Sequence, residues 1–186
     1  MSRRLFIAIP LSGPVATEAV AVCGSMDKKC PRARWVDRKN LHVTVLFMGD
    51  VEDSKVEALR DRFRKCCSEH TPFELMATGV VSGPPVGRPT MLWINFDHSR
   101  EFASLAHGIY NFASFELDLS PQRNDVVPHV TLARFRDGLP RLCAEAAKHV
   151  KFETSFTVDT FVLYESRLTQ DGPMYIEIEK FAFSER

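Results

Sequence analysis

The stretch PHVTLAR, residues 128–134, repeats the pattern of an earlier stretch, LHVTVL at residues 41–46. Both are apolar runs rich in β-branched residues, a composition typical of strands. Because side chains alternate across a strand, each histidine shares a face with the threonine two positions later, and the apolar residue between them points the other way. We expect the two strands to lie side by side at the centre of a sheet, where the two imidazoles face each other across one cleft.

The duplication makes His42 and His129 the candidate catalytic residues. A single His-x-Thr sequence on a half-buried strand is common, and its histidine is usually a core or surface residue. Two copies in strand context, one in each half of a short chain, favour a shared function instead. The unperturbed pKa of an imidazole is about 6.5, so one histidine can act as base while the other acts as acid near neutral pH. The sequence alone does not fix which of them plays which part.

Further stretches accompany the two motifs: RLFIAIP at residues 4–10, Trp35-Val36 shortly before the first motif, FMG at residues 47–49 and LYESRL at residues 163–168. Together they resemble the two-histidine (2H) phosphoesterases over nearly the whole chain. Within that family they are similar to the bacterial and archaeal RNA 2′,3′-cyclic phosphodiesterases once described as 2′-5′ RNA ligases. The paired motif at this spacing carries the resemblance, because each of the other pieces is weak evidence by itself.

The resemblance implies an enzyme, an RNA 2′,3′-cyclic phosphodiesterase that needs no metal and no cofactor. Its substrate would be RNA with a 2′,3′-cyclic phosphate terminus, including tRNA fragments or small cyclic nucleotides. Its product would carry a 2′-phosphate, so that the leaving atom is O3′. The resemblance also implies that His42 is the proton donor and His129 the proton acceptor. A histidine pair suits this strained diester, because one imidazole takes a proton from the attacking water while the other protonates the departing ribose oxygen.

Four further residues are candidates for substrate binding. Thr44 and Thr131 share their strand faces with the histidines, and their hydroxyl groups can donate hydrogen bonds to the non-bridging phosphate oxygens, where charge builds up in the transition state. Arg134 follows the family pattern, but strict alternation turns it away from His129, so either a twist or bulge redirects it or its role is structural. Family members often have a basic residue and a phenylalanine before Pro-His, which this chain lacks, and Arg123 could partly substitute.

Charge is balanced over the chain but concentrated locally. Lysine and arginine together number 24, as do aspartate and glutamate, so no global field attracts nucleic acid. One basic segment precedes the first motif: Lys28, Lys29, Arg32, Arg34, Arg38 and Lys39, with Asp37 among them. It is either a solvated loop or an electrostatic lip for an RNA end. Within it, Trp35 either packs against the sheet or stacks on a base. Arg88, in the loop of residues 82–89, is either solvent-exposed or in contact with substrate.

Composition also bears on location and assembly. Five cysteines form an odd set without a C-x-x-C pair, which favours a reducing compartment over a disulfide framework and argues against a zinc knuckle. The start SRRLF resembles a twin-arginine export signal, but Pro10 interrupts the apolar run that follows. No run approaches the roughly 18–20 apolar residues that cross a bilayer. We therefore expect a cytoplasmic protein that does not enter a membrane, and a monomer, because nothing in the sequence indicates an obligate assembly.

The order of the predicted elements suggests two similar lobes. Besides the two motif strands, strands are expected at residues 4–9, 73–81, 91–96, 156–165 and 175–183, and helices at residues 13–27, 51–70, 102–113 and 139–149. An Asp-Gly turn joins the last two strands into a hairpin. We predict an α+β fold of two pseudo-symmetric lobes of antiparallel-rich sheet with outer helices, whose motif strands flank a central cleft. With 45% hydrophobic residues, residues 1–186 can form a single domain of two intertwined lobes.

Two other functions compete with hydrolysis of a cyclic phosphate. The same site could join RNA ends through a 2′-5′ linkage, which is the reverse reaction. Alternatively, the protein could be a non-catalytic module that binds RNA termini or nucleotides. Turnover of an oligonucleotide that ends in a cyclic phosphate, in the presence of a chelator, separates the enzyme from the module.

Overall fold

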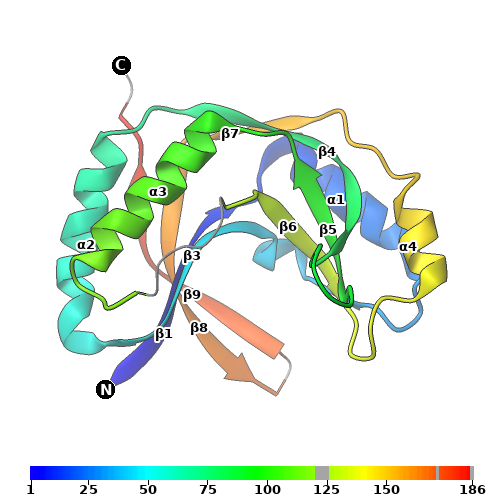
Figure 1. Ribbon diagram of the computed structural model, residues 1–186, viewed down its shortest axis with the longest axis horizontal. Coiled ribbons are helices and arrows are strands. Elements are labelled where there is room, and N and C mark those ends of the chain that lie inside the picture. Colours follow the sequence, from blue (N-terminus) through cyan, green and yellow to red (C-terminus); the bar gives the residue numbers. More distant parts are fainter. Residues whose placement is uncertain (120–125, 171, 185–186) are drawn as a thin grey trace.

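The computed structural model describes residues 1–119, 126–170 and 172–184 (Figure 1). In chain order the elements are β1 (Ser2–Pro10), α1 (Gly13–Asp27), β2 (Arg34–Trp35), the 3₁₀ helix η1 (Arg38–Asn40), β3 (His42–Glu52), α2 (Asp53–Ser68), β4 (Phe73–Gly83), β5 (Met91–Phe96), α3 (Arg100–Ser114), β6 (His129–Arg134), α4 (Arg141–Ala147), β7 (Ser155–Val158), β8 (Thr160–Thr169) and β9 (Gly172–Ala182). Every paired strand in this part of the chain runs antiparallel to its neighbour. The predicted α+β class is confirmed.

The strands form one curled sheet, in the order β7-β4-β5-β6-β3-β1-β8-β9, with β2 paired to β6. The two strands that carry the His-x-Thr motifs, β3 and β6, are neighbours at its centre, as predicted. They are paired at Val43 and Val130, and both valines are fully buried. The apolar residue of each motif therefore belongs to the core. The histidine and threonine on either side of it are left on the opposite face of the sheet.

Two lobes meet where β3 lies beside β6. Counted from the centre of the sheet to its edges, one lobe contains the strands β3, β1, β8 and β9, and the other contains β6, β5, β4 and β7. Helices α2 and α3 contact each other and β3, whereas α1 contacts β7 and α4 contacts β4. Figure 1 shows the first helix pair on the left of the molecule and the second pair on the right. Each lobe thus has a row of four strands covered by two outer helices, and the short β2 is added beside β6. This arrangement agrees with the predicted pseudo-symmetry.

The lobes do not correspond to the two halves of the chain. β4 follows α2 in the sequence but pairs with β5 in the other lobe. Likewise, β7 pairs with β4, but the next strand, β8, pairs with β1. The prediction of one continuous strand over residues 156–165 is therefore wrong, because the chain changes lobes at Asp159. The backbone N–H of Phe183 donates to the Asp159 carbonyl at 2.8 Å and anchors this crossing.

Local chemistry explains where the helices begin and end. The Ser99 hydroxyl accepts a hydrogen bond from the Phe102 N–H at 3.0 Å and caps α3, as serine commonly does. Helix α2 begins at Asp53 and not at 51, because Val51 pairs with Arg3 in the sheet. Helix α4 is shorter than the predicted 139–149, since Pro140 provides its N-cap and the helix ends at Ala147.

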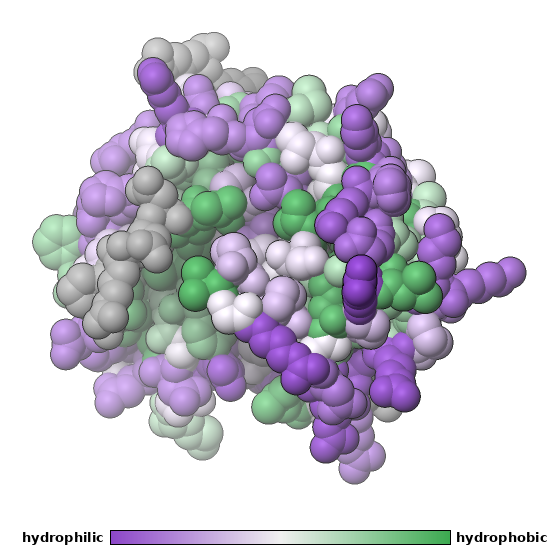
Figure 2. All heavy atoms as spheres, turned by 45° about the vertical axis from the view of Figure 1, so that its right-hand side comes forward, coloured by the Kyte–Doolittle hydropathy of each residue, from purple (hydrophilic) through white to green (hydrophobic). Residues whose placement is uncertain are grey.

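One face of the molecule is mainly polar. Figure 2 shows hydrophilic side chains over most of one face, with hydrophobic atoms in small separate groups among them. In the part of the chain that the structure describes, no helix combines the length and the apolar character needed to span a membrane.

Candidate active site

The pairing of β3 with β6 brings the two motifs together on one face of the sheet. Because Val43 is opposite Val130 in an antiparallel ladder, the residues one step away on each strand are opposite each other. The histidine of each motif is therefore placed across from the threonine of the other. All four side chains line a single cleft of about 600 Å³. The two imidazoles thus line the same cleft, each opposite the threonine of the other motif.

His42 is held by the backbone just before its own strand. Its Nδ1 lies 2.7 Å from the carbonyl oxygen of Asn40. A carbonyl only accepts, so Nδ1 carries the proton and Nε2 is the free nitrogen of the neutral ring. Nε2 lies 3.1 Å from the Thr44 hydroxyl oxygen, so that hydroxyl donates to it. Both ring nitrogens are thereby oriented by residues two positions away in sequence.

His129 is held in the same way. Its Nδ1 lies 3.0 Å from the carbonyl oxygen of Val127, again two residues upstream, and it therefore donates to that carbonyl. Nε2 is left as the nitrogen available to a ligand. The duplicated sequence thus produces a duplicated local geometry, in which a backbone carbonyl fixes the tautomer of each imidazole.

Burial in the cleft lowers the pKa of both histidines, because it disfavours the charged imidazolium. The hydrogen bonds to Asn40 and Val127 oppose this effect. The positive charge of Arg134 lowers both pKa values further, and for His42 so does the charge of His129. The electrostatics therefore favour neutral rings in the free protein and couple the two histidines to each other and to the arginine.

A bulge in β6 directs Arg134 into the cleft. Leu92 pairs with Ala133 and Trp93 pairs with Thr131, so Leu132 has no partner across β5. An extra residue of this kind interrupts alternation, and both Leu132 and Ala133 are fully buried. Arg134 then lies on the face of Thr131 and lines the cleft. Of the two alternatives that the sequence left open, the bulge is the one found.

Other predicted residues have different positions. Arg123 lies outside the residues that the structure describes. Arg88, in the β4–β5 loop, donates to the carbonyl of Asp137 in the connection between β6 and α4, and it does not line the cleft. From the basic segment, Arg34 lines the cleft. Trp35 lines it as well, while its Nε1 donates to Asp27 at 2.7 Å.

Two aromatic residues at the histidines were not predicted. The Trp93 ring stacks on His129 with a centroid distance of 3.9 Å and an interplanar angle of 26°. The Tyr175 ring is edge-on to His42 at 5.3 Å and 89°. Trp93 is in β5 and Tyr175 in β9, so only the strand order, which periodicity does not reveal, places them here. Trp93 Nε1 is buried and has no hydrogen-bond partner among the described residues.

A metal site would need additional ligands near the histidines. The described residues contain no group of three or more histidine, cysteine, aspartate or glutamate side chains placed to hold an ion. Structural zinc sites in proteins commonly have four such ligands and catalytic ones three. The side chains that line the cleft supply imidazoles for proton transfer, hydroxyl groups for hydrogen bonding and the positive charge of the arginines.

Comparison with known proteins gives relatives of one kind. RNA 2′,3′-cyclic phosphodiesterase of Methanothermobacter thermautotrophicus is 26% identical over 186 residues, covering 97% of this chain and 99% of the relative. That of Aquifex aeolicus is 25% identical and covers 96% of each. That of Geobacillus stearothermophilus is 27% identical over 95% of this chain, which spans only 56% of that relative's length.

Solved structures share the fold. A Thermus thermophilus protein superimposes with a TM-score of 0.84 at 24% identity, covering 97% of both chains. E. coli LigT in complex with 3′-AMP superimposes with a TM-score of 0.79 at 22% identity, covering all of both chains. At these identities the likeness establishes the fold alone.

A family model extends the likeness to the sequence that builds the cleft. It matches residues 19–170, most of the chain, and this range includes both His-x-Thr strands. The chain belongs to the 2′-5′ RNA ligase superfamily.

Proposed function

We propose that this protein hydrolyses 2′,3′-cyclic phosphate ends of RNA to 2′-phosphate ends, without a metal ion. One observation supports this most directly: each histidine donates Nδ1–H to the carbonyl two residues upstream, so that two free Nε2 atoms serve one cleft. The names of the relatives point to the same reaction. Paired imidazoles are sufficient acid and base for a strained diester.

In the proposed reaction, His129 acts as the base and His42 as the acid. Nε2 of His129 takes a proton from water as the water oxygen bonds to phosphorus. The P–O3′ bond breaks, and Nε2–H of a protonated His42 transfers its proton to O3′. The ribose then lies on the side of His42, where the cleft continues into a second pocket. On the other side, the Trp93 ring covers a face of His129. This asymmetry supports the direction.

The threonines and Arg134 stabilise the phosphate in this proposal. While His42 is neutral, the Thr44 hydroxyl donates to its Nε2. Once His42 is protonated, its Nε2 no longer accepts this hydrogen bond, and the hydroxyl hydrogen is free to bond a non-bridging oxygen. Protonation of the acid thus prepares a donor for the transition state. Thr131 and Arg134 line the same cleft and supply a second hydroxyl and a positive charge.

The test is an oligoribonucleotide that ends in a 2′,3′-cyclic phosphate, incubated with the protein in excess chelator. We expect a 2′-phosphate end, identified by ³¹P NMR and mass spectrometry. Inclusion of an RNA with a free 5′-hydroxyl group in a parallel reaction measures end joining. The absence of any product, a 3′-phosphate product, or activity only after addition of a divalent metal would contradict the proposal.

We also propose that the protein acts as a cytoplasmic monomer on RNA fragments such as those of tRNA, or on small cyclic nucleotides. The state of the cysteines supports a reducing compartment. All five cysteines are free, and Cys30, Cys66 and Cys143 are buried. Burial raises the pKa of Cys66 to about 12. Size-exclusion chromatography with light scattering tests the monomer.

A further inference from the structure

One of the two histidines carries a stacked aromatic ring. The Trp93 indole lies on the imidazole of His129 with a centroid distance of 3.9 Å and an interplanar angle of 26°. Trp93 pairs with Thr131 and Asn95 pairs with His129, so the tryptophan and the histidine are diagonal neighbours across the β5–β6 ladder. The register of these two strands therefore fixes the stack.

The indole is also held from the neighbouring strand β4. A Cβ atom added to Gly83 would lie 2.3 Å from two carbon atoms of the Trp93 ring, so only a residue without a side chain leaves room for the indole. Because the strand order is β4-β5-β6, Gly83 and His129 lie on opposite sides of the strand that carries Trp93. Three adjacent strands thus determine where the ring lies.

This placement leaves the indole N–H without a hydrogen bond. Trp93 Nε1 is buried and has no partner among the described residues, which is a rare and unfavourable state for a buried donor. The other tryptophan, Trp35, donates its Nε1–H to Asp27 at 2.7 Å. A phenylalanine in place of Trp93 would fill space without burying a donor. What an indole offers in addition is the aromatic face that attracts a cation most strongly.

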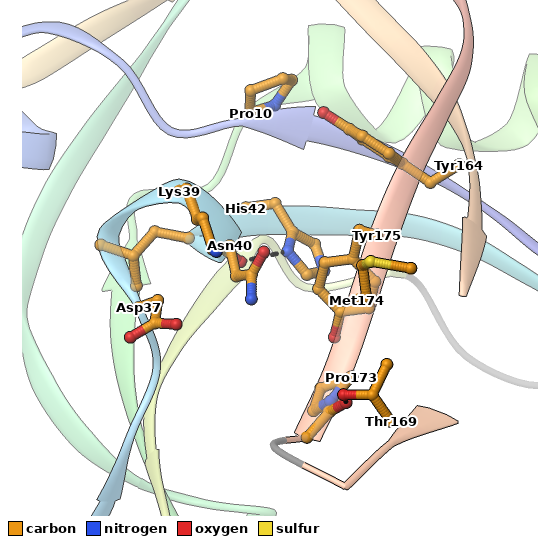
Figure 3. Close-up of a pocket in the computed structure, with 12 residues that line it drawn as sticks. Pro10, Asp37, Lys39, Asn40, His42, Tyr164, Thr169, Pro173, Met174 and Tyr175 are labelled. Carbon is orange, nitrogen blue, oxygen red and sulfur yellow. Dashed lines mark hydrogen bonds between the residues drawn. The ribbon is translucent and has the colours of Figure 1, made fainter. Parts of the chain in front are cut away.

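The environment of His42 is different (Figure 3). Its Nδ1 donates to the Asn40 carbonyl, and the Tyr175 ring beside it is edge-on, at 5.3 Å and 89°. The Phe6 ring is tilted by 43° at 5.4 Å. Within the part of the chain that the structure describes, neither ring is stacked on His42. The stack therefore distinguishes His129 from its partner in the cleft.

We infer that Trp93 is a positioning residue that stabilises the imidazolium formed when His129 takes a proton from the attacking water. The inference rests on the proposed function, in which His129 is the base. The proton moves from water to Nε2, and the new positive charge then lies against the negative face of the indole. The neutral ring gains less from this contact, so the stack favours the transition state over the ground state. Trp93 itself exchanges no atom and no electron.

Other charges act on the same imidazole. The charged and titratable side chains that line the cleft with His129, among the described residues, are Arg34, Asp37, His42, Arg134 and Tyr175. From β5, the side chains of Trp93 and Asn95 carry no charge. Burial and Arg134 lower the pKa of His129. The cation–π contact acts in the opposite direction, because it stabilises the charged form of the ring. Trp93 thus offsets part of the loss of basicity.

Fluorination of the indole tests the inference almost without a change of shape. Fluorine withdraws electron density from the ring face and so weakens a cation–π contact, while the packing is kept. The chain contains two tryptophans, so incorporation of mono- or difluorotryptophan into Trp35→Phe labels Trp93 alone. With each added fluorine, the pKa of His129 should fall, as followed by NMR titration of its imidazole. In the same series kcat on a cyclic phosphate oligonucleotide should fall about three- to ten-fold in all.

Trp93→Phe is the matched control, because its label enters Trp35 alone. There the pKa of His129 should not depend on fluorine. If Trp35→Phe does not fold, the doubly labelled wild type replaces it, and this control subtracts the effect of Trp35. A pKa of His129 that stayed constant or rose on fluorination of Trp93 would overturn the inference. A constant kcat despite a lower pKa would overturn it too, since the stack would then not act in the reaction.

Failure of the proposed function has a different signature. In that case wild type would turn over no cyclic phosphate, whether or not its tryptophans carry fluorine. The NMR titration needs no substrate, and a His129→Gln spectrum identifies the resonance to follow. A fall in the pKa with fluorine at Trp93 would then still support stabilisation of the imidazolium by the indole. A pKa that is the same for every indole would refute it.

Discussion

At the scale of single residues, the two histidines depend on backbone carbonyls to set their tautomers. Asn40 and Val127 accept from Nδ1, so Nε2 is the nitrogen that exchanges protons in both rings. Such an arrangement needs no carboxylate partner for orientation. It also means that substitution of the Asn40 side chain would leave the hydrogen bond to His42 in place.

Removal of either imidazole should abolish most of the activity. We expect His42→Ala and His129→Ala each to lower kcat by about two to four orders of magnitude, the usual contribution of one positioned proton-transfer group. Rates on a cyclic phosphate oligonucleotide measure this. His98→Ala, which changes an exposed histidine outside the cleft, is the control and should keep the wild-type rate. A fully active variant at either motif would reject the acid–base pair.

The pH dependence should reflect the environment of the pair. A bell-shaped kcat/KM profile is expected, since activity needs one neutral and one protonated ring, and it rises through one pKa and falls through the other. Burial and Arg134 lower the pKa of both histidines, so both limbs should lie on the acid side of their positions for exposed imidazoles.

Replacement of Arg134 by glutamine should shift that profile. Loss of its positive charge raises the pKa of both histidines, so both limbs should move to higher pH, while kcat/KM falls through loss of a phosphate contact. Arg88→Gln, outside the cleft, should move neither limb. A profile unchanged in Arg134→Gln would show that the guanidinium does not act on the rings.

At the scale of elements, most predictions that depend on periodicity were confirmed. Helices α1, α2 and α3 and the β8–β9 hairpin lie close to their predicted positions. The bulge at Leu132 and the break at Asp159 were not predictable, because both arise from pairing with distant strands. The same limit explains why Trp93 and Tyr175 were missed: their positions at the histidines depend on which strands are neighbours.

The β4–β5 pair offers a test of how the site is supported. A Cβ atom on Gly83 would overlap the Trp93 indole, so Gly83→Ala must displace the ring that stacks on His129. We expect a loss of stability of about 1–3 kcal/mol and at least about a ten-fold loss in kcat. Thermal denaturation and kinetics measure both. Gly24→Ala, where nothing lies within 4 Å of the added atom, should keep activity. Normal kinetics in Gly83→Ala would show that the stack is dispensable.

At the scale of the whole molecule, the crossed connections should make the two lobes fold together. β4 and β8 each lie in the lobe opposite to that of the strand before them in the chain, so neither chain half contains a complete lobe. We therefore propose that residues 1–186 form a single domain. Far-UV circular dichroism and tryptophan fluorescence should report one coincident denaturant transition. Two separated transitions would indicate lobes that unfold independently.

The pairing of β3 with β6 at Val43 and Val130 also limits which insertions and deletions the two motif strands can accept. A shift of one residue in the pairing register of a strand moves each of its side chains to the opposite face of the sheet. Insertion of one amino acid between a histidine and its valine would put both side chains on the same face, so that either the imidazole would be buried or the valine would be exposed. Substitutions that preserve the alternation of the two strands should therefore be tolerated at this position of the sheet, whereas a change in the length of either motif should not.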